Sequence, residues 1–210
     1  MNVTAFNGSP RREGNTYHAI KLVADELERE GIQVEIIHVG HKAIRGCTAC
    51  GICGKNRDER CSFDDAVNGW IQKMKAADGI ILGSPVYYAG INGTMKAFLD
   101  RAFFTASASG GLFRHKVGAA VAAVRRTGGI PAIEQMHKYF TISEMPVATS
   151  NYWNVVHGGS PGEVLADDEG VQIMQVLGRN MAWLMKLMEN GRGRVPEPGQ
   201  VRKVYTNFVR

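Results

Sequence analysis

The chain contains four cysteines, and all of them lie in one short segment, GCTACGICGKNRDERC at residues 46–61. Their spacing is Cys47-x2-Cys50-x2-Cys53-x7-Cys61. Thiols clustered this tightly serve as metal ligands or redox groups more often than as structural disulfides when a chain shows no secretory leader. Three thiolates at such intervals can wrap one face of a cubane, and a fourth from a short loop closes it. The segment therefore predicts a 4Fe-4S site.

Other uses of the four thiols stay open. Zinc takes two separated cysteine pairs more often than a run of three, although His38 and His41 lie upstream and would complete a zinc set. A redox disulfide between Cys53 and Cys61, or within either closely spaced pair, is the second alternative. Thiols without bound metal are the third. The charged stretch KNRDER before Cys61 favours easy loss of a cluster.

The elements that must position this segment alternate between strand and helix patterns along the chain. Apolar strand runs fall at 2–6, 33–39, 79–85, 117–124 and 146–151, and helical spacing falls at 16–30, 64–76, 93–104, 131–140 and 168–189. Alternating units of this kind specify a parallel sheet with helices on both faces. We therefore predict an α/β fold with a five-stranded, flavodoxin-like sheet in the order 2-1-3-4-5. Ligands of such sheets lie at the carboxyl ends of the strands.

The loop NGSPRREGNT at 7–16 joins the first strand to the first helix. It is not a Walker A motif, because Gly8 and Gly14 are separated by five residues and no lysine follows. It offers backbone amides near a helix N-terminus together with polar side chains, namely those of Ser9, Arg11, Asn15 and Thr16. An amide nest at a helix N-terminus stabilises a phosphate dianion. The loop therefore predicts a phosphate monoester site.

Two further loops follow later strands. GSPVYYAGINGTMKAFLDR at 83–101 has an open backbone and two adjacent tyrosines, Tyr87 and Tyr88, whose flat rings suit a planar ligand. VRRTGG at 124–129 has two glycines that let backbone amides approach a ligand closely. A phosphate at the first loop and an aromatic ring between the other two describe a flavin mononucleotide (FMN) site.

The segments GSPRREGNT and GSPVYYAGINGTMKAFLDR resemble the phosphate loop and second flavin loop of the NADPH-dependent FMN reductase superfamily. The cysteine segment followed by SFDDA resembles that of its iron-sulfur flavoprotein branch, which carries a compact four-cysteine motif. The region beginning SNYWNVVHGG also looks like the C-terminal part of these proteins. The resemblance spans about residues 2 to 189.

This resemblance implies a set of site residues. Ser9, Arg11, Asn15 and Thr16 would hold the FMN phosphate. Pro85, Val86, Tyr87, Tyr88 and Gly90 would line the ribityl chain and ring, with Thr127, Gly128 and Gly129 near the pyrimidine edge. Cys47, Cys50, Cys53 and Cys61 would hold a cluster.

The resemblance also implies an activity. The expected protein is an oxidoreductase that moves electrons from NAD(P)H or a ferredoxin-like donor to an acceptor, as a homodimer or homotetramer. The alternative is an electron carrier that exchanges electrons only with protein partners. A zinc-stapled interaction module without flavin is a third reading.

Composition excludes other classes. The net charge is +5, but Lys and Arg are scattered without a recognition helix, so we expect no nucleic-acid partner. No apolar run approaches the length of a bilayer span and MNVTAFNGSP is not a signal peptide, so we expect a cytoplasmic protein without a membrane partner. One domain is expected at 1–190, including a Cys-rich loop at 46–62. A tail at 191–210 would pack on the surface or on a partner subunit.

Overall fold

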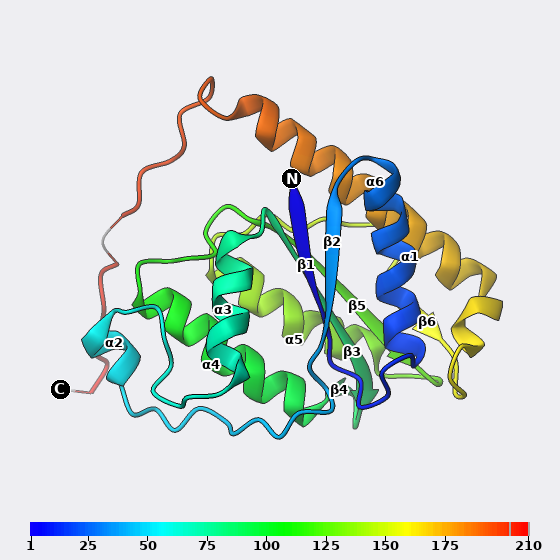
Figure 1. The fold of residues 1–210 in the computed structure, drawn as a ribbon, viewed down its shortest axis with the longest axis horizontal. Coiled ribbons are helices and arrows are strands. Elements are labelled where there is room, and N and C mark those ends of the chain that lie inside the picture. The colour runs from blue at the N-terminus through cyan, green and yellow to red at the C-terminus, as the bar shows by residue number, and fades with distance from the viewer. Residues whose placement is uncertain (202, 210) are drawn as a thin grey trace.

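The structure, a computed structural model, describes residues 1–201 and 203–209. Its centre is a six-stranded sheet made of β1 (Asn2–Asn7), β2 (Gln33–His38), β3 (Gly79–Tyr87), β4 (Gly90–Ile91), β5 (Val117–Val124) and β6 (Val155–His157). Parallel strands follow the order β2-β1-β3-β5-β6, and β4 pairs antiparallel with the end of β3 (Figure 1). The predicted α/β class and parallel sheet are confirmed. The prediction of five strands in the order 2-1-3-4-5 is wrong, because the chain forms β4 between the third and fourth predicted strands.

Helices cover both faces of this sheet. On one face lie α1 (Asn15–Arg29) and α6 (Asp168–Gly191), and on the other lie α3 (Ala66–Ala76), α4 (Gly93–Ala108) and α5 (Gly129–Ile142) (Figure 1). The short helices α2 (Ile52–Asn56) and η1 (Glu163–Ala166) lie in connections. No helix within the described residues is long and apolar enough to cross a lipid bilayer.

Two separate apolar cores hold these layers together. One lies between the sheet and α3, α4 and α5, and includes Phe6, Trp70 and Phe98. The other lies between the sheet and α1 and α6, and includes Ile20 and Met181. Because β1, β3 and β5 are buried on both faces, they read in the sequence as continuous apolar runs. This pattern made the three central strands predictable.

The last strand lies later in the chain than the sequence pattern suggested. Segment 146–151, predicted as a strand, makes only an isolated bridge between Val147 and Gly118. The chain then turns, with the Ser150 hydroxyl donating to the Tyr152 carbonyl at 2.6 Å. The Asn154 side chain donates to the Ala120 carbonyl at 3.1 Å, and β6 begins at the next residue. A side-chain amide thus supplies the bond that a strand amide would have made.

Helices α1 and α6 approach each other closely at Gly178. A Cβ atom there would lie 2.7 Å from the Val23 carbonyl oxygen and 2.7 Å from the Glu26 Cβ atom. Glu26 is buried, and its carboxylate accepts a hydrogen bond from the Arg179 Nε atom at 3.0 Å. This bond from Arg179 holds the pKa of Glu26 below its ordinary value. A small residue and an ion pair between the buried Glu26 and the exposed Arg179 therefore fix α1, whose first turn forms part of the site.

The segment after α6 runs back across the side of the molecule that carries α3 and α4, toward α2 (Figure 1). Its described residues form no helix or strand. The Arg114 guanidinium donates to the Pro198 carbonyl at 2.7 Å, and the Gln200 amide donates to the Gly110 carbonyl at 3.3 Å. Hydrogen bonds therefore attach the middle of this segment to the loop before β5.

We expect Gly178→Ala to lower the free energy of unfolding by about 1–3 kcal/mol, because the added methyl must push backbone away from α6. The matched control is Gly69→Ala in α3, where a Cβ atom meets nothing within 4 Å. That change should leave stability equal or raise it by up to about 1 kcal/mol. Urea unfolding of both variants measures the difference, and equal midpoints would contradict this account of the α1–α6 contact.

Candidate functional site

The loop between β1 and α1 leaves polar atoms without partners. Gly14 is the N-cap of α1 and provides no side-chain hydrogen bond to the first turn. The Asn15 Oδ1 and Thr16 Oγ1 atoms are buried there with no hydrogen-bond partner, and Thr16 is 1% exposed. Buried polar groups without partners are rare and mark a missing ligand or water. The uncapped helix end and the Thr16 hydroxyl fit an anion, whereas the Asn15 Oδ1 atom can only accept a hydrogen bond, so binding of a phosphate by Asn15 stays a prediction.

The other two residues predicted at this loop lie in different surroundings. Ser9 is buried, and its hydroxyl accepts the Arg11 backbone N–H at 3.1 Å. Its own N–H donates to the Asn7 side chain at 3.0 Å. The Arg11 residue is exposed. Ser9 thus shapes the loop from within, and the Arg11 side chain is free to reach an anion from solvent.

Side chains from outside the loop hold it in place. The Asn92 side chain caps α4 and also donates to the Gly8 carbonyl, and the Asn92 backbone N–H donates to the Ser84 hydroxyl at 3.1 Å. From the other side, the His38 Nε2 atom lies 2.7 Å from the Ser9 carbonyl oxygen. Sequence reasoning missed both anchors. Asn92 precedes a helical pattern and so carried the signal of an N-cap, whereas the sequence marked His38 only as an alternative zinc ligand.

The second loop is a tight hairpin. Tyr87 pairs with Gly90, and the turn between them consists of Tyr88 at φ 48° and Ala89 at φ 58°. Two-residue hairpin turns with positive φ at both positions favour Asn and Gly, so a tyrosine and an alanine here hold strained backbone. Tyr88 is fully exposed and Tyr87 is about half exposed. The predicted ring surface is therefore presented at the hairpin tip, while Pro85 and Val86 lie half-buried below it.

The third loop lies directly against this hairpin. A Cβ atom on Gly128 would lie 2.9 Å from the Ala89 Cα atom and 3.0 Å from the Val86 Cγ1 atom, so only glycine fits. Gly128 has φ 90° and is the N-cap of α5, which Gly129 begins. Like α1, α5 has no side-chain cap. The capped helices are α3, α4 and α6, through Asp65, Asn92 and Asp167.

The structure thus brings the three predicted loops together at the carboxyl ends of β1, β3 and β5. It also adds a part that sequence reasoning missed. A cavity of about 260 Å³ lies between the third loop and the start of α6, and the exposed rings of Tyr152 and Trp153 line it. Thr127, Gly128 and Gly129 line the same cavity. The two adjacent aromatic residues at 152–153 were the available signal.

The cysteine segment lies away from these loops, beside α4. All four thiols line one cavity of about 20 Å³, together with Phe63, Arg101 and Phe104. Cys53 is buried in α2, Cys61 is partly buried, and Cys47 and Cys50 are exposed. A hydrogen bond from the Ser62 hydroxyl lowers the pKa of the Cys50 thiol below its ordinary value. The thiol set therefore faces one space, as a shared ligand would require.

The four sulfur atoms are nevertheless not gathered at ligating distances. No group of three or more His, Cys, Asp or Glu side chains among residues 1–201 and 203–209 is placed to hold a metal ion. All four cysteines are free thiols. Neither His38 nor His41 lines the thiol cavity. Donor chemistry and a common cavity fit a cluster, and binding one would require the exposed thiols to close in.

Comparisons with known proteins agree with this geometry. The family model described as NADPH-dependent FMN reductase matches residues 1–160. An iron-sulfur flavoprotein of Methanocaldococcus jannaschii is 36% identical over 196 residues, covering 90% of this chain and 100% of that protein. Another, of Methanosarcina thermophila, is 29% identical over 203 residues, with coverage of 92% and 100%.

Solved structures share the flavodoxin-like fold. RosB with bound 8-demethyl-8-formylriboflavin-5′-phosphate superposes with a TM-score of 0.72 at 14% identity, covering 100% of this chain and 94% of that one. At this identity the likeness concerns the fold alone. A flavodoxin from the domain Archaea superposes with a TM-score of 0.58 at 19% identity, covering 89% of this chain and 99% of that one, which confirms the flavodoxin-like class predicted from the strand and helix order.

Asn15→Ala combined with Thr16→Val should weaken FMN binding, because the changes remove the Asn15 NH2 group and the Thr16 hydroxyl, two donors at the uncapped end of α1. Hydrogen bonds to a charged group contribute about 1.5–3 kcal/mol, which corresponds to roughly ten- to a hundredfold in Kd. Fluorescence titration with FMN measures it. Riboflavin, which lacks the phosphate, should bind the variant and the wild type equally, and an unchanged FMN Kd would rule out this phosphate site.

Replacing the hairpin tip Tyr88-Ala89 with Asn-Gly should stabilise the flavin-free protein by about 1–2 kcal/mol, because glycine and asparagine tolerate positive φ. The same change should weaken FMN binding by removing the Tyr88 ring. Glu144→Gly is the control, since Glu144 also has a positive φ of 55° but lies away from the three loops. Glu144→Gly also removes the ion pair with Arg114, so the comparison concerns FMN affinity alone, which should equal that of the wild type. A hairpin variant with wild-type FMN affinity would exclude Tyr88 from the site.

Proposed function

The chain belongs to the NADPH-dependent FMN reductase family, and from this premise we propose that it is an FMN-dependent oxidoreductase moving electrons from NAD(P)H to an acceptor. The observation that carries the proposal is the first turn of α1. There the Thr16 hydroxyl is buried without a hydrogen-bond partner among the described residues, beside an uncapped helix N-terminus. A phosphate dianion supplies the missing acceptor for the helix amides and for the Thr16 hydroxyl, and it would pair with Asn15 only through the side-chain NH2 group, because the Asn15 Oδ1 atom has no proton to donate.

Each loop has a distinct role in this proposal. Asn15 and Thr16 bind the phosphate, Arg11 adds a cation from solvent, and Ser9 keeps the loop in its binding shape. The hairpin residues Pro85, Val86, Tyr87, Tyr88 and Gly90 cover the ring and the ribityl chain. Thr127, Gly128 and Gly129 present the open N-terminus of α5 to the pyrimidine edge. The positive end of that helix favours negative charge on the ring.

FMN supplies the redox chemistry, because its ring accepts a hydride from a reduced nicotinamide and passes electrons onward. The chain's own contribution is binding, orientation and electrostatics. Two uncapped helix N-termini, at α1 and α5, stabilise negative charge at the phosphate and at the ring. No side chain of the three loops needs to act as an acid or base in this scheme.

We further propose that Cys47, Cys50, Cys53 and Cys61 hold a 4Fe-4S cluster that accepts electrons one at a time. The common cavity of the four thiols supports this, as do relatives whose names state that they are iron-sulfur flavoproteins. The thiol cavity is lined by Arg101 and Thr105 of α4, and the second loop leads into α4 at Gly93. At 1.5 Å per residue, about 12–18 Å of helix separates the two sites.

Assembly and location stay predictions. A homodimer or homotetramer would place a second chain near the exposed Tyr88, and the tail at 191–210 would contact either its own chain or a partner. A cytoplasmic location also stays a prediction.

Anaerobic titration of the FMN-loaded protein tests the activity. We expect NADPH or NADH to bleach the flavin absorbance with one equivalent of nicotinamide oxidised per flavin. Reduction by dithionite or reduced ferredoxin but by neither nicotinamide would contradict a reductase and favour an electron carrier. Iron and sulfide analysis of the same anaerobic preparation tests the cluster, and flavin without iron would contradict that part alone.

A further inference from the structure

A buried arginine on α4 directs all of its hydrogen bonds at the cysteine segment. The Arg101 side chain is 0% exposed, although it comes from a surface helix. A guanidinium has five N–H donors, and each finds an acceptor here. The acceptors are both carboxylate oxygens of Asp65 at 2.6 and 2.9 Å, the Cys61 sulfur at 3.3 Å, and the carbonyls of Arg45 and Phe63 at 3.3 and 3.4 Å.

These acceptors lie at the two edges of the cysteine segment. Arg45 precedes the first cysteine. Cys61 is the last cysteine, and Phe63 and Asp65 follow it. Two guanidinium groups contact the Phe63 ring, with Arg45 at 5.0 Å and Arg101 at 5.1 Å from its centroid. Arg101 therefore closes the loop by joining its beginning to its end.

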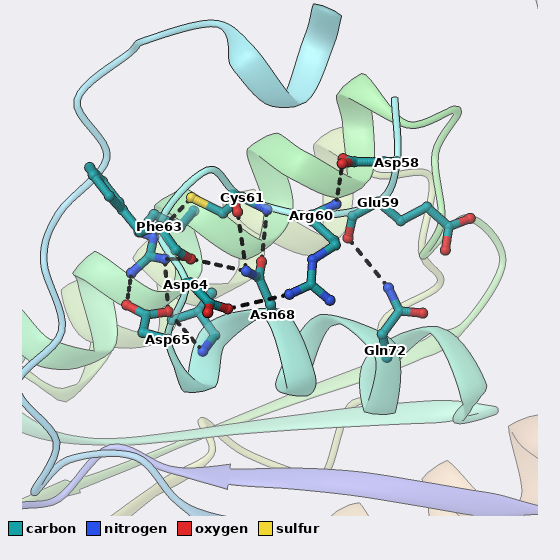
Figure 2. Close-up of polar contacts among 11 residues, drawn as sticks. Asp58, Glu59, Arg60, Cys61, Phe63, Asp64, Asp65, Asn68 and Gln72 are labelled. Carbon is teal, nitrogen blue, oxygen red and sulfur yellow. Dashed lines mark hydrogen bonds and ion pairs between the residues drawn. The ribbon is translucent and has the colours of Figure 1, made fainter. Parts of the chain in front are cut away.

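A second side chain fixes Cys61 from α3. The Asn68 Oδ1 atom accepts the Cys61 backbone N–H at 2.7 Å, and the Asn68 amide donates to the carbonyls of Cys61 and Phe63 at 3.1 and 2.9 Å. Figure 2 shows Asn68 rising from the helix beneath Cys61, with Asp65 one turn earlier on the same helix. The Cys61 backbone and sulfur are thus held by separate groups from separate helices.

The part of the segment between these edges is held far less. Cys47 and Cys50 are exposed, and Ala49, Gly51 and Arg57 adopt positive φ. The four thiols share a cavity but are not gathered at ligating distances. One thiol is therefore fixed in advance, while the remaining thiols must move to meet a common ligand.

We propose that Arg101 is a positioning residue for the cysteine site: it locks Cys61 at the cavity and places a buried positive charge against its sulfur. The proposal rests on the 4Fe-4S function proposed above. Burying a guanidinium is costly unless every donor is satisfied. Here the cost is offset by contacts that organise only this loop. A cluster ligated through Cys61 carries negative charge, so an adjacent fixed cation stabilises its more reduced form.

Amide hydrogen exchange in metal-free, FMN-loaded protein tests the positioning. Arg101→Lys keeps the charge but cannot form the five-bond fork, and Asp65→Asn removes the charged acceptor while keeping an effective N-cap on α3. Both variants should exchange faster in peptides covering 43–48 and 59–66 and should be unchanged in α1. Lys96→Gln, which removes an exposed charge from the same helix, should match the wild type. Wild-type exchange rates in both peptides of Arg101→Lys would contradict the proposal that Arg101 fixes Cys61.

Cluster reconstitution separates positioning from plain structural support. Loss of iron to a chelator should be about ten- to a hundredfold faster in Arg101→Lys and Asp65→Asn than in the wild type. The reduction potential of the cluster should fall in Arg101→Met but stay close to the wild type in Arg101→Lys, which retains the charge. Equal potentials in the Met and wild-type proteins would contradict a charge acting on the sulfur. If the wild type takes up no iron, the proposed cluster fails, and the exchange data still decide whether Arg101 fixes Cys61.

Discussion

Unsatisfied groups at the N-terminus of α1 are the constraint on which the rest of the site depends. An α-helix leaves its first backbone donors unpaired, and proteins normally satisfy them with a capping side chain. The chain does so at α3, α4 and α6, but not at α1 or α5, whose first turns lie at the carboxyl edge of the sheet. The buried Thr16 hydroxyl beside one of these ends adds a further donor that needs an acceptor. An anionic cofactor resolves a deficit that the fold itself creates.

The surrounding residues then act to keep this region from collapsing onto itself. Asn92 and His38 hold the carbonyls of Gly8 and Ser9 from opposite sides, so the loop cannot fold down over the helix end. A Cβ atom on Gly40 would lie 2.1 Å from the Gly8 carbonyl oxygen, so the chain leaving β2 presses on the same point. The positions of Asn92, His38 and Gly40 explain why a loop of small and polar residues is rigid enough to bind a phosphate.

Local patterns predicted the parts of this molecule that depend on local interactions. The central strands, the three loops and the thiol set follow from apolar runs, glycines and spacing, which a sequence displays directly. The errors arose where a single long-range contact determines the local structure. The Asn154 side chain replaces a strand amide, so β6 starts later than the apolar run at 146–151 that was predicted as a strand. The need for glycine at Gly178 comes from the opposite helix. Arg101 has the sequence pattern of an ordinary residue on a helix surface, although it is buried. No spacing rule connects such a residue to a partner on another element.

Helix α4 links the two sites mechanically. Its cap, Asn92, holds the phosphate loop, and two turns later Arg101 holds the end of the cysteine segment. A helix is stiff over this length, so the separation between the flavin loops and Cys61 is fixed by one element rather than by the flexible loop between residues 46 and 60. Within the cysteine segment, the exposed thiols of Cys47 and Cys50 are the parts that would have to move to meet a common ligand.

The distribution of backbone strain supports the same division. Seven non-glycine residues within the described chain have positive φ; Ala49, Arg57 and Glu59 are in the cysteine segment, and Tyr88 and Ala89 are at the hairpin tip. Such conformations persist only where the surroundings over-determine them. At the hairpin, the bare Cα of Gly128 leaves room for the Ala89 backbone and holds the turn closed. At the cysteine segment, Arg101 and Asn68 hold the edges and leave the strained residues between them. The strained residues named here therefore lie in the two segments, the cysteine segment and the hairpin tip, that would present side chains to a ligand.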